Sequence, residues 1–502
     1  MAKRLWTTSA LAVVVITLFG ACASTTPSPS ASAAAGASAS AAASAAASAS
    51  AEASAEASAP AASLAPAVPA VPTGYTELDQ ALGADKPFNG KTVSIQTQWI
   101  GGEGTNFAAS VADFKTATGI NVQIDSIGSS HETVLKTRID GGKPPDLAML
   151  AQPTPILAYA ADGKVQDVAK LMDPKKLSDE HPNTIGLVTQ GASIWGVPYK
   201  ADVKSTIWYP IKAFEAKGYT VPKTWDELIA LSDKIVADGT NPWCVSAGGP
   251  GSATGWQITD WVEEVVLKTK GLDYYNDWIS HKVTFEDPGI KDAFDKYVGK
   301  IFFTPNYVFG TNTAIVNTDQ KTTMDPMFTP GNGDMSAPKC WMQKVPTWYG
   351  PDFFPDQRAS GQPSKYVIGT DVGIFPFPTI DPAQKIAEGS ADTLMMLVDR
   401  PEVRAVAEFL ATPEGIQRWI ETGSAISTNT STPAAWYAGA YKLKVASDIA
   451  NNAAGIGFDA SDLMPAKVGA GTFWTKLDDW ANAGGTNTDD VLKAIDASWP
   501  AQ

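Results

Sequence analysis

The stretch from Lys91 to Ile127 changes its hydrophobic period from two residues to a helical spacing and back again. KTVSIQTQWIGG alternates apolar and polar residues as a strand does, and Gly101-Gly102 end it. NFAASVADFKTATG then carries apolar residues at helical spacing as far as Gly119, and INVQIDSI follows as a second strand. This order predicts a βαβ unit, so we expect an α/β fold with a mostly parallel sheet.

The following segments continue the alternation of strands and helices. We expect a helix over residues 131–139, a strand in PPDLAMLAQP that is buried on both faces, and a helix in PILAYAADG that Gly163 caps. KTWDELIALSDKIVADG predicts an amphipathic helix, because Thr224 and Glu227 have the spacing of a capping box. The chain changes character near residues 200–205, which we interpret as a crossover between two lobes. TDVGIFPFPTI, residues 370–380, predicts another β crossing.

The N-terminal residues are those of an exported protein. Lys3 and Arg4 precede a short apolar run, LAVVVITLF, so residues 1–21 are predicted to be a secretory signal peptide. Small residues directly before Cys22 resemble a bacterial lipoprotein processing box, although Phe19 replaces the usual leucine; ordinary cleavage near Ala21 is the alternative. Residues 22–72 are rich in Ala, Ser and Pro and predict a flexible tether, which leaves residues 73–502 for the folded part.

Composition excludes several classes of function. The formal net charge of −15 argues against nucleic acid, because phosphate binding needs concentrated Lys and Arg. His131, His181 and His281 are too far apart in sequence for a zinc motif, so we expect neither a metal nor another cofactor. Cys244 and Cys340 form one disulfide in an exported protein or remain two buried free thiols.

Six segments, taken in order, resemble the extracellular solute-binding proteins of carbohydrate ABC importers, the group that includes the maltodextrin-binding proteins. The segments are WIGGEG, FKTATGINVQID, GGKPPDLAML, GVPYKADVKSTIWY, AEFLATPEGIQRWIETGSAIS and DLMPAKVGAGTFW. NPWCVSAGGPGSATGWQITDWVEE and PKCWMQ are most similar to the alpha-glucoside-binding members. GTNTAIVNTDQKTTMDPMF departs from the group, which commonly has a glycine-tryptophan pair after a short strand there.

The resemblance implies a two-lobe periplasmic-binding-protein fold, type II-like, with discontinuous lobes joined by hinge crossovers. We expect one lobe at about residues 90–201 and 371–430, and the other at about 205–368 and 431–502. It also implies capture of an alpha-glucoside (maltose, trehalose or sucrose type) or a maltodextrin in the interlobe cleft, and delivery to ABC permease subunits with a separate ATPase. The expected protein is a monomer, held outside the cell membrane only by a lipid on Cys22.

A sugar site needs aromatic platforms and planar hydrogen-bonding groups, and open α/β sheets place ligands at the carboxyl ends of strands. Trp99 and Glu103 follow the first strand, and the glycines between them allow close backbone approach. The resemblance implies contacts from Glu103, from Gln152 after the third strand and from Asp202 in the crossover. The alternatives are a solvated acid at Glu103 and a hinge acid that caps backbone amides at Asp202.

Aromatic residues of the second lobe are the expected platforms. Trp256 opens a predicted helix, with Asp260 one turn later, and both are expected to face the cleft. The resemblance implies that Trp474 stacks on the sugar, while Phe473 and Leu477 pack inward. The alternative is a core aromatic at a helix start.

Two other classes of protein remain. A secreted glycoside hydrolase would need two carboxylates opposed across a bond, about 5–10 Å apart, and residues distant in sequence could supply them. No GxSxG elbow or GxxxxGK[ST] loop occurs in the sequence, so we expect a binding protein and not an enzyme. A cell-surface structural protein would suit the anchor and the tether but not the βαβ pattern.

Overall fold

The computed structural model describes residues 66–248, 254–328, 335–437, 442, 444–446 and 454–500. The predicted signal peptide, Cys22 and the tether as far as residue 65 lie outside the described residues. Residues 64–502 form one compact unit. Within the described ranges, no helix has both the length and the apolar character needed to cross a bilayer.

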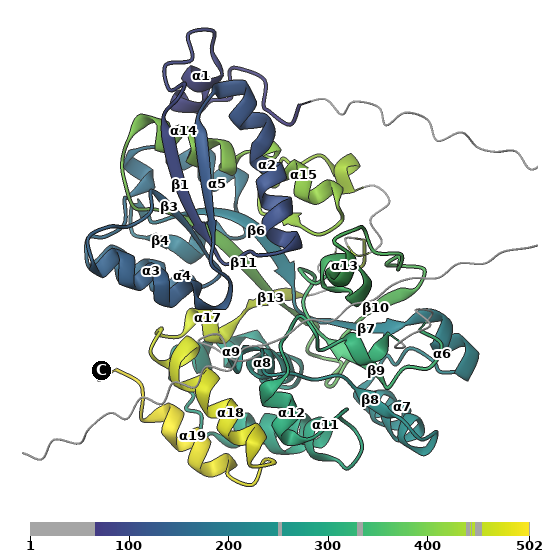
Figure 1. Cartoon of the computed structure of the whole chain (residues 1–502). Helices are drawn as coiled ribbons and strands as arrows, with labels where there is room; N and C mark the ends of the chain where they lie inside the picture. The colour runs from purple at the N-terminus through teal and green to yellow at the C-terminus, as the bar shows by residue number, and fades with distance from the viewer. Residues whose placement is uncertain are drawn as a thin grey trace, which may run out of the picture. The chain divides into compact units, whose positions relative to one another are not determined.

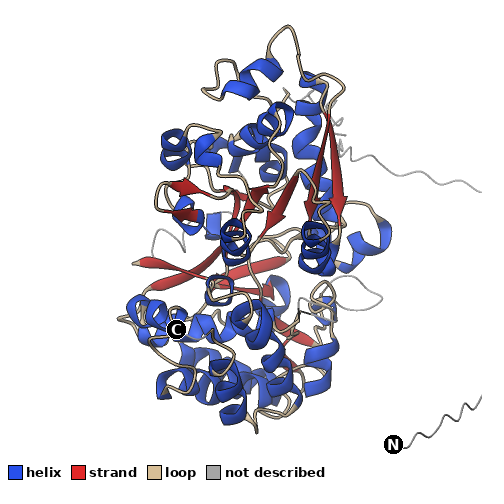
Figure 2. Cartoon of the chain, turned by 90° about the vertical axis from the view of Figure 1, so that its left-hand side faces the viewer, coloured by secondary structure: helices blue, strands red, loops and turns tan. Residues whose placement is uncertain are grey.

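The described residues of the first lobe surround a seven-stranded sheet with the order β12-β6-β11-β3-β1-β2, and β13 pairs with β11 (Figure 1). Its strands are β1 (Thr92–Thr97), β2 (Asn121–Ser126), β3 (Leu147–Leu150), β6 (Val197–Val203), β11 (Ile386–Met396), β12 (Ile426–Ser427) and β13 (Gly455–Phe458). The helices of this lobe are α1 (Thr76–Leu82), α2 (Gly102–Thr118), α3 (His131–Asp140), α4 (Pro153–Ala161), α5 (Pro174–Glu180), α14 (Pro401–Ala411) and α15 (Glu414–Glu421). Figure 2 shows helices on both sides of these strands.

A four-stranded sheet with the order β10-β7-β9-β8 lies in the second lobe. Its strands are β7 (Thr206–Pro210), β8 (Asn241–Trp243), β9 (Cys340–Lys344) and β10 (Val372–Pro376). A separate small hairpin of β4 (Thr189–Gln190) and β5 (Ser193–Ile194) belongs to the first lobe, where Ile194 is part of the core. The helices of the second lobe are α6 (Ile211–Lys217), α7 (Trp225–Ala237), α8 (Trp256–Lys270), α9 (Leu272–Ile279), α10 (Pro288–Asp292), α11 (Gly299–Phe303), α12 (Asn312–Asn317), α13 (Pro355–Ser360), α17 (Ala460–Leu463), α18 (Trp474–Asn482) and α19 (Thr488–Asp496).

The local sequence signals are confirmed at several elements. β1 runs parallel to β2 with Ile95 opposite Ile124, as the βαβ prediction requires. α2 ends at Gly119, whose left-handed conformation lets its N–H bond back to the helix. α7 begins with the predicted capping box, in which the Thr224 hydroxyl accepts from the Glu227 N–H and the Glu227 carboxylate accepts from the Thr224 N–H.

The first sheet is mixed, which corrects the expectation of a mostly parallel sheet. β11 lies between β3 and β6 and runs antiparallel to both. It enters the first lobe from the second one, so it crosses the sheet in the opposite direction to the βαβ strands. This eleven-residue strand is the longest in the described part of the chain and carries one of the connections between the lobes.

The lobe boundaries differ from the expected ones in three places. β10 was expected in the first lobe, but it pairs with β7 of the second sheet, with Gly373 opposite Tyr209. β13 was expected in the second lobe, but it pairs with β11 in the first sheet. α1 precedes residue 90, yet it packs in the first lobe, where Leu78 is part of the hydrophobic core. Strand pairing and core packing, rather than chain order, decide these memberships.

Cys244 and Cys340 form a disulfide that closes a loop of 96 residues. The bond joins residues next to β8 and at the start of β9, two parallel neighbours in the second sheet. The alternative of two free thiols is therefore wrong. In the chain-entropy description, closing a loop of this length restricts the unfolded chain more than a short loop would.

Two buried histidines are expected to make the fold sensitive to acid. Burial lowers the pKa of both His131 and His181 to about 4. Nε2 of His131 donates to the backbone oxygen of Met149 at 2.6 Å, and Nε2 of His181 donates to that of Ala411 at 3.2 Å; these bonds favour the charged rings, but burial outweighs them. Because the folded pKa lies below the unfolded value of 6.5, stability is present above pH 6.5 and is lost as the pH falls toward 4.

Each histidine is expected to cost about 2 kcal/mol of the free energy of unfolding by pH 5. Urea unfolding at pH 7 and pH 5 measures this loss for the wild type and for His131→Gln. The variant should be less stable at pH 7 but should lose about 2 kcal/mol less than the wild type on acidification. An equal loss in both proteins would show that His131 does not titrate in this range.

Candidate functional site

A cavity of about 200 Å³ lies between the two lobes. The first lobe contributes residues that follow the carboxyl ends of β1 and β3, such as Glu103 and Gln152, as well as strand residues of β6 and β11. The second lobe contributes the starts of α8 and α18 and the loop around Trp348. The position at the carboxyl ends of parallel strands is the one in which open α/β sheets bind ligands.

The structure brings most of the predicted contact residues to this cavity. Its lining includes Trp99, Glu103, Gln152, Asp202, Trp256 and Trp474. Asp260 is not among the lining residues; it lies behind them, where its Oδ1 accepts from the Lys204 Nζ at 2.8 Å. The polar and aromatic residues that we predicted from distant parts of the sequence are therefore neighbours around one space.

Trp99 borders the cavity but belongs to the core of the first lobe. Its exposed fraction is only 2 %, and its ring makes an edge contact with Trp419 at 4.8 Å between centroids. Phe107 and Tyr199 pack on other parts of the same ring. Trp99 therefore forms a wall of the cavity and does not offer a free platform.

Three tryptophans from the second lobe line the cavity: Trp256, Trp348 and Trp474. The centroids of Trp256 and Trp348 are 5.9 Å apart. Trp474 donates from Nε1 to the Ser461 hydroxyl at 3.0 Å. Flat apolar rings with a polar edge are suited to contact the CH face of a sugar.

The backbone around Gly255 explains how two of these rings come together. Gly255 has φ +88° and precedes Trp256, the first residue of α8. A Cβ on Gly255 would lie 1.9 Å from the backbone oxygen of Trp474, so only glycine lets the starts of α8 and α18 touch. Phe473 is buried in the second core and Trp474 is outside that cluster, as the sequence interpretation of this helix entrance proposed.

The polar wall of the cavity is built on two neighbouring strands. Lys200 and Asp202 of β6 lie opposite Asp392 and Ser390 of β11. The Lys200 ammonium contacts the carboxylates of Asp202 and Asp392, the latter at 3.0 Å, and Gln98 donates to Asp392 at 2.7 Å. Burial alone would lower the pKa of Lys200, but the two carboxylates outweigh it and hold its pKa above the ordinary value.

Glu103 and Gln152 offer two different hydrogen-bonding groups. Burial raises the pKa of Glu103 to about 8, against the opposing charge of Lys200, so its carboxyl group is mostly protonated at neutral pH. The Gln152 side chain is 7 % exposed, and its carbonyl oxygen has no donor among the described residues. A ligand hydroxyl would satisfy this oxygen, which is costly to leave unpaired.

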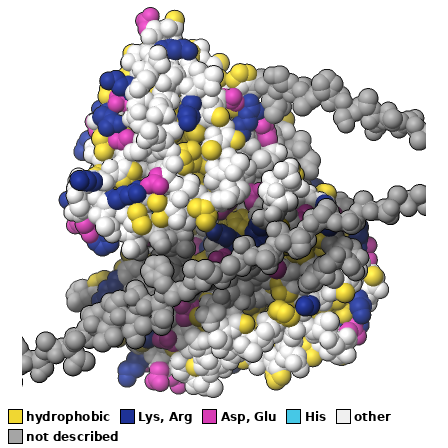
Figure 3. Space-filling view, viewed as in Figure 1, with side chains coloured by type: hydrophobic (Ala, Val, Ile, Leu, Met, Phe, Trp, Pro, Cys, Tyr) yellow, Lys and Arg dark blue, Asp and Glu magenta, His cyan; other side chains and the backbone are white. Residues whose placement is uncertain are grey.

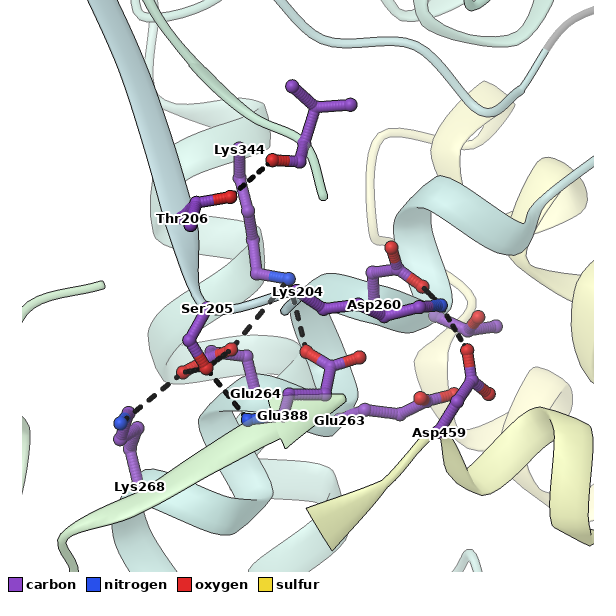
Figure 4. Close-up of polar contacts among 12 residues, drawn as sticks. Lys204, Ser205, Thr206, Asp260, Glu263, Glu264, Lys268, Lys344, Glu388 and Asp459 are labelled. Carbon is purple, nitrogen blue, oxygen red and sulfur yellow. Dashed lines mark hydrogen bonds and ion pairs between the residues drawn. The ribbon is translucent and has the colours of Figure 1, made fainter. Parts of the chain in front are cut away.

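Connections between the lobes meet at a buried ion-pair cluster, shown in Figure 4. Lys204 and Ser205 lie between β6 and β7, Glu388 lies in β11, and Asp459 precedes α17. Lys204 contacts both Asp459 and Asp260, the latter on α8. Ser205 links the cluster to β11, because its hydroxyl accepts from the Glu388 N–H at 2.8 Å. The chain thus passes from the first sheet to the second between Val203 and Thr206, at the end of the crossover predicted for residues 200–205.

Lys204 and Lys344 supply positive charge to this cluster: Lys204 contacts Asp260 and Asp459, and Lys344 contacts Glu388 at 3.2 Å. Carboxylate oxygens of Asp260, Glu263, Glu388 and Asp459 all lie within 4.8 Å of one another. Burial alone would lower the pKa of Lys204, but Asp260 and Asp459 hold it well above the ordinary value. The Lys204 ammonium also lies 5.8 Å from the ring centroid of Trp256, so the ion-pair cluster is in contact with the cavity wall.

Several residues of the cavity were not predicted from the sequence, although some of them carried a signal there. Gln98 directly follows β1, at the edge of the sheet where ligands bind, and Lys200 lies beside the predicted Asp202. Trp348 and Asp392 follow no pattern that the sequence reveals; only the chain path brings them to the cavity. Residues 319–321 of the segment that departs from the family pattern also line the cavity, with polar side chains in place of an aromatic one.

Comparison with known proteins agrees with this architecture. The family described as bacterial extracellular solute-binding protein matches residues 100–417. The alpha-glucosides-binding periplasmic protein AglE of Rhizobium meliloti is 33 % identical over 82 % of this chain and 88 % of that protein. The osmoprotective compounds-binding protein GgtB of Synechocystis is 31 % identical over 84 % of this chain and 95 % of that protein.

Solved structures have the same fold at low sequence identity. The bacterial solute receptor AcbH has a TM-score of 0.67 at 15 % identity, over 81 % of this chain and 98 % of that one. Maltose-bound MalE3 of T. maritima has a TM-score of 0.61 at 18 % identity, with the same coverage of both chains. The two-lobe fold, the family match over most of both lobes and the two relatives above 30 % identity lead to one conclusion. The chain belongs to the bacterial extracellular solute-binding proteins.

Proposed function

We propose that the protein is the extracytoplasmic sugar-binding component of an ABC importer, which captures an alpha-glucoside in the interlobe cavity and delivers it to the permease. The observation that supports the proposal is that the two lobes contribute different kinds of side chain to the cavity. Three tryptophans come from the second lobe, and the carboxyl and amide groups of Glu103, Gln152 and Asp202 come from the first. Such a site matches the apolar face and the hydroxyl rim of a sugar.

The preference for an alpha-glucoside rests on the relatives. AglE is named for alpha-glucosides, and it is similar to this chain over most of both proteins. GgtB is named for osmoprotective compounds, so an osmoprotective compound is the second possible ligand. We propose a small alpha-glucoside such as maltose, trehalose or sucrose in preference to a long maltodextrin, in keeping with the cavity of about 200 Å³.

The proposed mechanism is closure of the two lobes about the hinge. A ligand that contacts Trp474 and Glu103 at once binds only the closed arrangement, so binding selects that arrangement. A closed receptor then presents a surface made from both lobes to the permease. The proposed mechanism is binding and not bond cleavage, so we propose a binding protein rather than an enzyme. The glycoside hydrolase alternative finds no support among the relatives, which are solute-binding proteins.

The proposal also includes the location of the protein. We propose that a lipid on Cys22 holds the monomeric protein at the outer face of the cell membrane, and that the Ala/Ser/Pro-rich segment serves as its tether. On the face shown in Figure 3, basic and acidic side chains are interspersed, as suits a receptor in solution near a membrane.

A thermal-shift screen tests the proposed ligand class. At one hundred times Kd, a ligand stabilises the folded state by about 2.7 kcal/mol, which corresponds to a rise in Tm of roughly 5 °C. We expect such a rise with at least one of maltose, trehalose and sucrose. Mannitol serves as a polyol control, and chromatography of the same mixtures detects any glucose that hydrolysis releases. Free glucose would favour the hydrolase, and a rise with mannitol alone would contradict the preference for glucosides.

A further inference from the structure

Asp352 of the second lobe lies at the start of α2 in the first lobe. Its Oδ2 accepts from the Asn106 side chain at 3.1 Å, across the gap between the lobes. Its Oδ1 accepts from Gln357, a residue of α13 in its own lobe, at 2.7 Å. Figure 1 shows α13 next to the lower end of α2. One carboxylate therefore has a hydrogen-bond partner in each lobe.

The first residue of α2 is shaped for this carboxylate. A Cβ on Gly102 would lie 2.1 Å from Cγ and 2.5 Å from Oδ1 of Asp352. Side chains longer than that of glycine would therefore keep the carboxylate away from the helix. The sequence predicted that the glycines of this loop allow close approach to a ligand, but the group that approaches Gly102 is a side chain of the other lobe.

The start of α2 also favours a negative charge. α2 has 17 residues, and its N-cap, Gly101, provides no side chain to accept from the first turn. The free N–H groups of a helix start carry a partial positive charge, so an anion is stabilised there. Asp352 supplies this anion from the opposite lobe, and only while the lobes are close.

The contact is next to the cavity but is not part of it. Glu103, the residue after Gly102, lines the cavity, whereas Asp352 does not. A second hydrogen bond between the lobes joins α4 to α17: the Thr154 hydroxyl donates to the backbone oxygen of Asp462 at 2.9 Å. That bond is neutral, and its acceptor is a backbone oxygen that no substitution can remove. The contact of Asp352 depends on a side chain, so replacing Asp352 removes the whole contact.

We propose that Asp352 is a positioning residue, which holds the two lobes closed over the cavity and raises ligand affinity without touching the ligand. The proposal rests on the proposed function, because it takes a sugar as the ligand whose affinity changes. If only the closed fraction binds well, apparent Kd rises in proportion as that fraction falls. Loss of one charge-assisted bond and one helix-end interaction is expected to raise Kd about tenfold.

Calorimetric titration with the sugar that gives the largest thermal shift measures Kd for the wild type, Asp352→Ala and Asn106→Ala. We expect Asp352→Ala to bind about tenfold more weakly and Asn106→Ala a few times more weakly, because Asn106→Ala removes the hydrogen bond but leaves the carboxylate at the start of α2. The double variant should be no weaker than Asp352→Ala alone. Asp356→Ala is the matched control: it is a nearby acid, in α13, whose partners, Ser364 and Lys365, belong to its own lobe. Its Kd should equal that of the wild type.

Small-angle X-ray scattering of the ligand-free proteins separates this inference from the proposed function. Asp352→Ala is expected to have a larger radius of gyration than the wild type, with an unchanged melting temperature, because open lobes keep their separate cores. If no sugar binds the wild type but the radius still increases, the proposed function fails and the positioning role stands. An unchanged radius, or a Kd within twofold of the wild type, would overturn the role of Asp352.

Discussion

Replacing Lys204 with methionine is expected to lower the free energy of unfolding by about 3–5 kcal/mol, because it leaves buried carboxylates without their cation. Asp260 and Asp459 both contact the Lys204 ammonium, and all three side chains are almost fully buried. Asp459 shows the coupling: burial alone would raise its pKa, but Lys204 outweighs burial and holds the pKa below the ordinary value. Urea unfolding at pH 7 measures the loss.

Lys136→Met provides the matched control for Lys204→Met. Lys136 pairs with Asp140 on the surface, where the two side chains are 64 % and 58 % exposed. Such a pair contributes at most about 1 kcal/mol, so this variant should be nearly as stable as the wild type. Adding Asp260→Asn to Lys204→Met should recover part of the lost stability by removing one unpaired charge. A loss of less than 1 kcal/mol for Lys204→Met would mean that the cluster does not depend on this lysine.

Trp474→Ala is expected to weaken sugar binding at least a hundredfold, because aromatic stacking and the shape of the cavity are lost together. The ring lines the cavity and lies outside the core clusters, but it is only 5 % exposed and donates to Ser461, so the ligand-free Tm should fall, though by less than replacement of a core tryptophan would lower it. Calorimetry and thermal melts on the same samples give both quantities. The variant also tests the alternative that Trp474 is a core aromatic.

Replacing the neighbouring residue, Phe473, is expected to have the opposite effects on stability and on sugar binding. Phe473 has no exposed surface and packs against Trp278 and Phe285 in the second core. Phe473→Leu should therefore lower the Tm and leave sugar binding within a fewfold of the wild type. If Trp474→Ala melts much earlier than Phe473→Leu while still binding sugar, then Trp474 is structural and the proposed platform is wrong.

The sequence predicted the fold well where local signals agree with tertiary packing. The βαβ start and the capping box at Thr224 follow from residue spacing, and the crossover before β7 follows from the change in the character of the chain near residues 200–205. The position of β10 could not be predicted, because its membership depends on pairing with β7, far away in sequence. The direction of β11 was hidden for the same reason: a strand that returns from another lobe has the same hydrophobic pattern as a parallel one.

The candidate site was predictable by residue type more than by role. Trp256 and Trp474 were identified from helix starts and family resemblance, and both line the cavity. Trp99 was predicted from its place after the first strand, yet Trp419 and Tyr199 enclose it, and no linear pattern records that packing. The ion pairs of Lys200 and Lys204 could not be predicted from the sequence either, because their partners Asp392 and Asp260 lie on a strand and a helix that are distant in the chain.

Isothermal titration calorimetry of the protein with maltose, trehalose and sucrose tests the central claim most directly. We predict saturable heat for at least one of them, with one sugar per chain, and no free glucose in the cell afterwards. The same titration of Trp474→Ala should give no measurable heat. Absence of heat with all three sugars, or release of glucose during the titration, would contradict the account of a sugar-binding receptor.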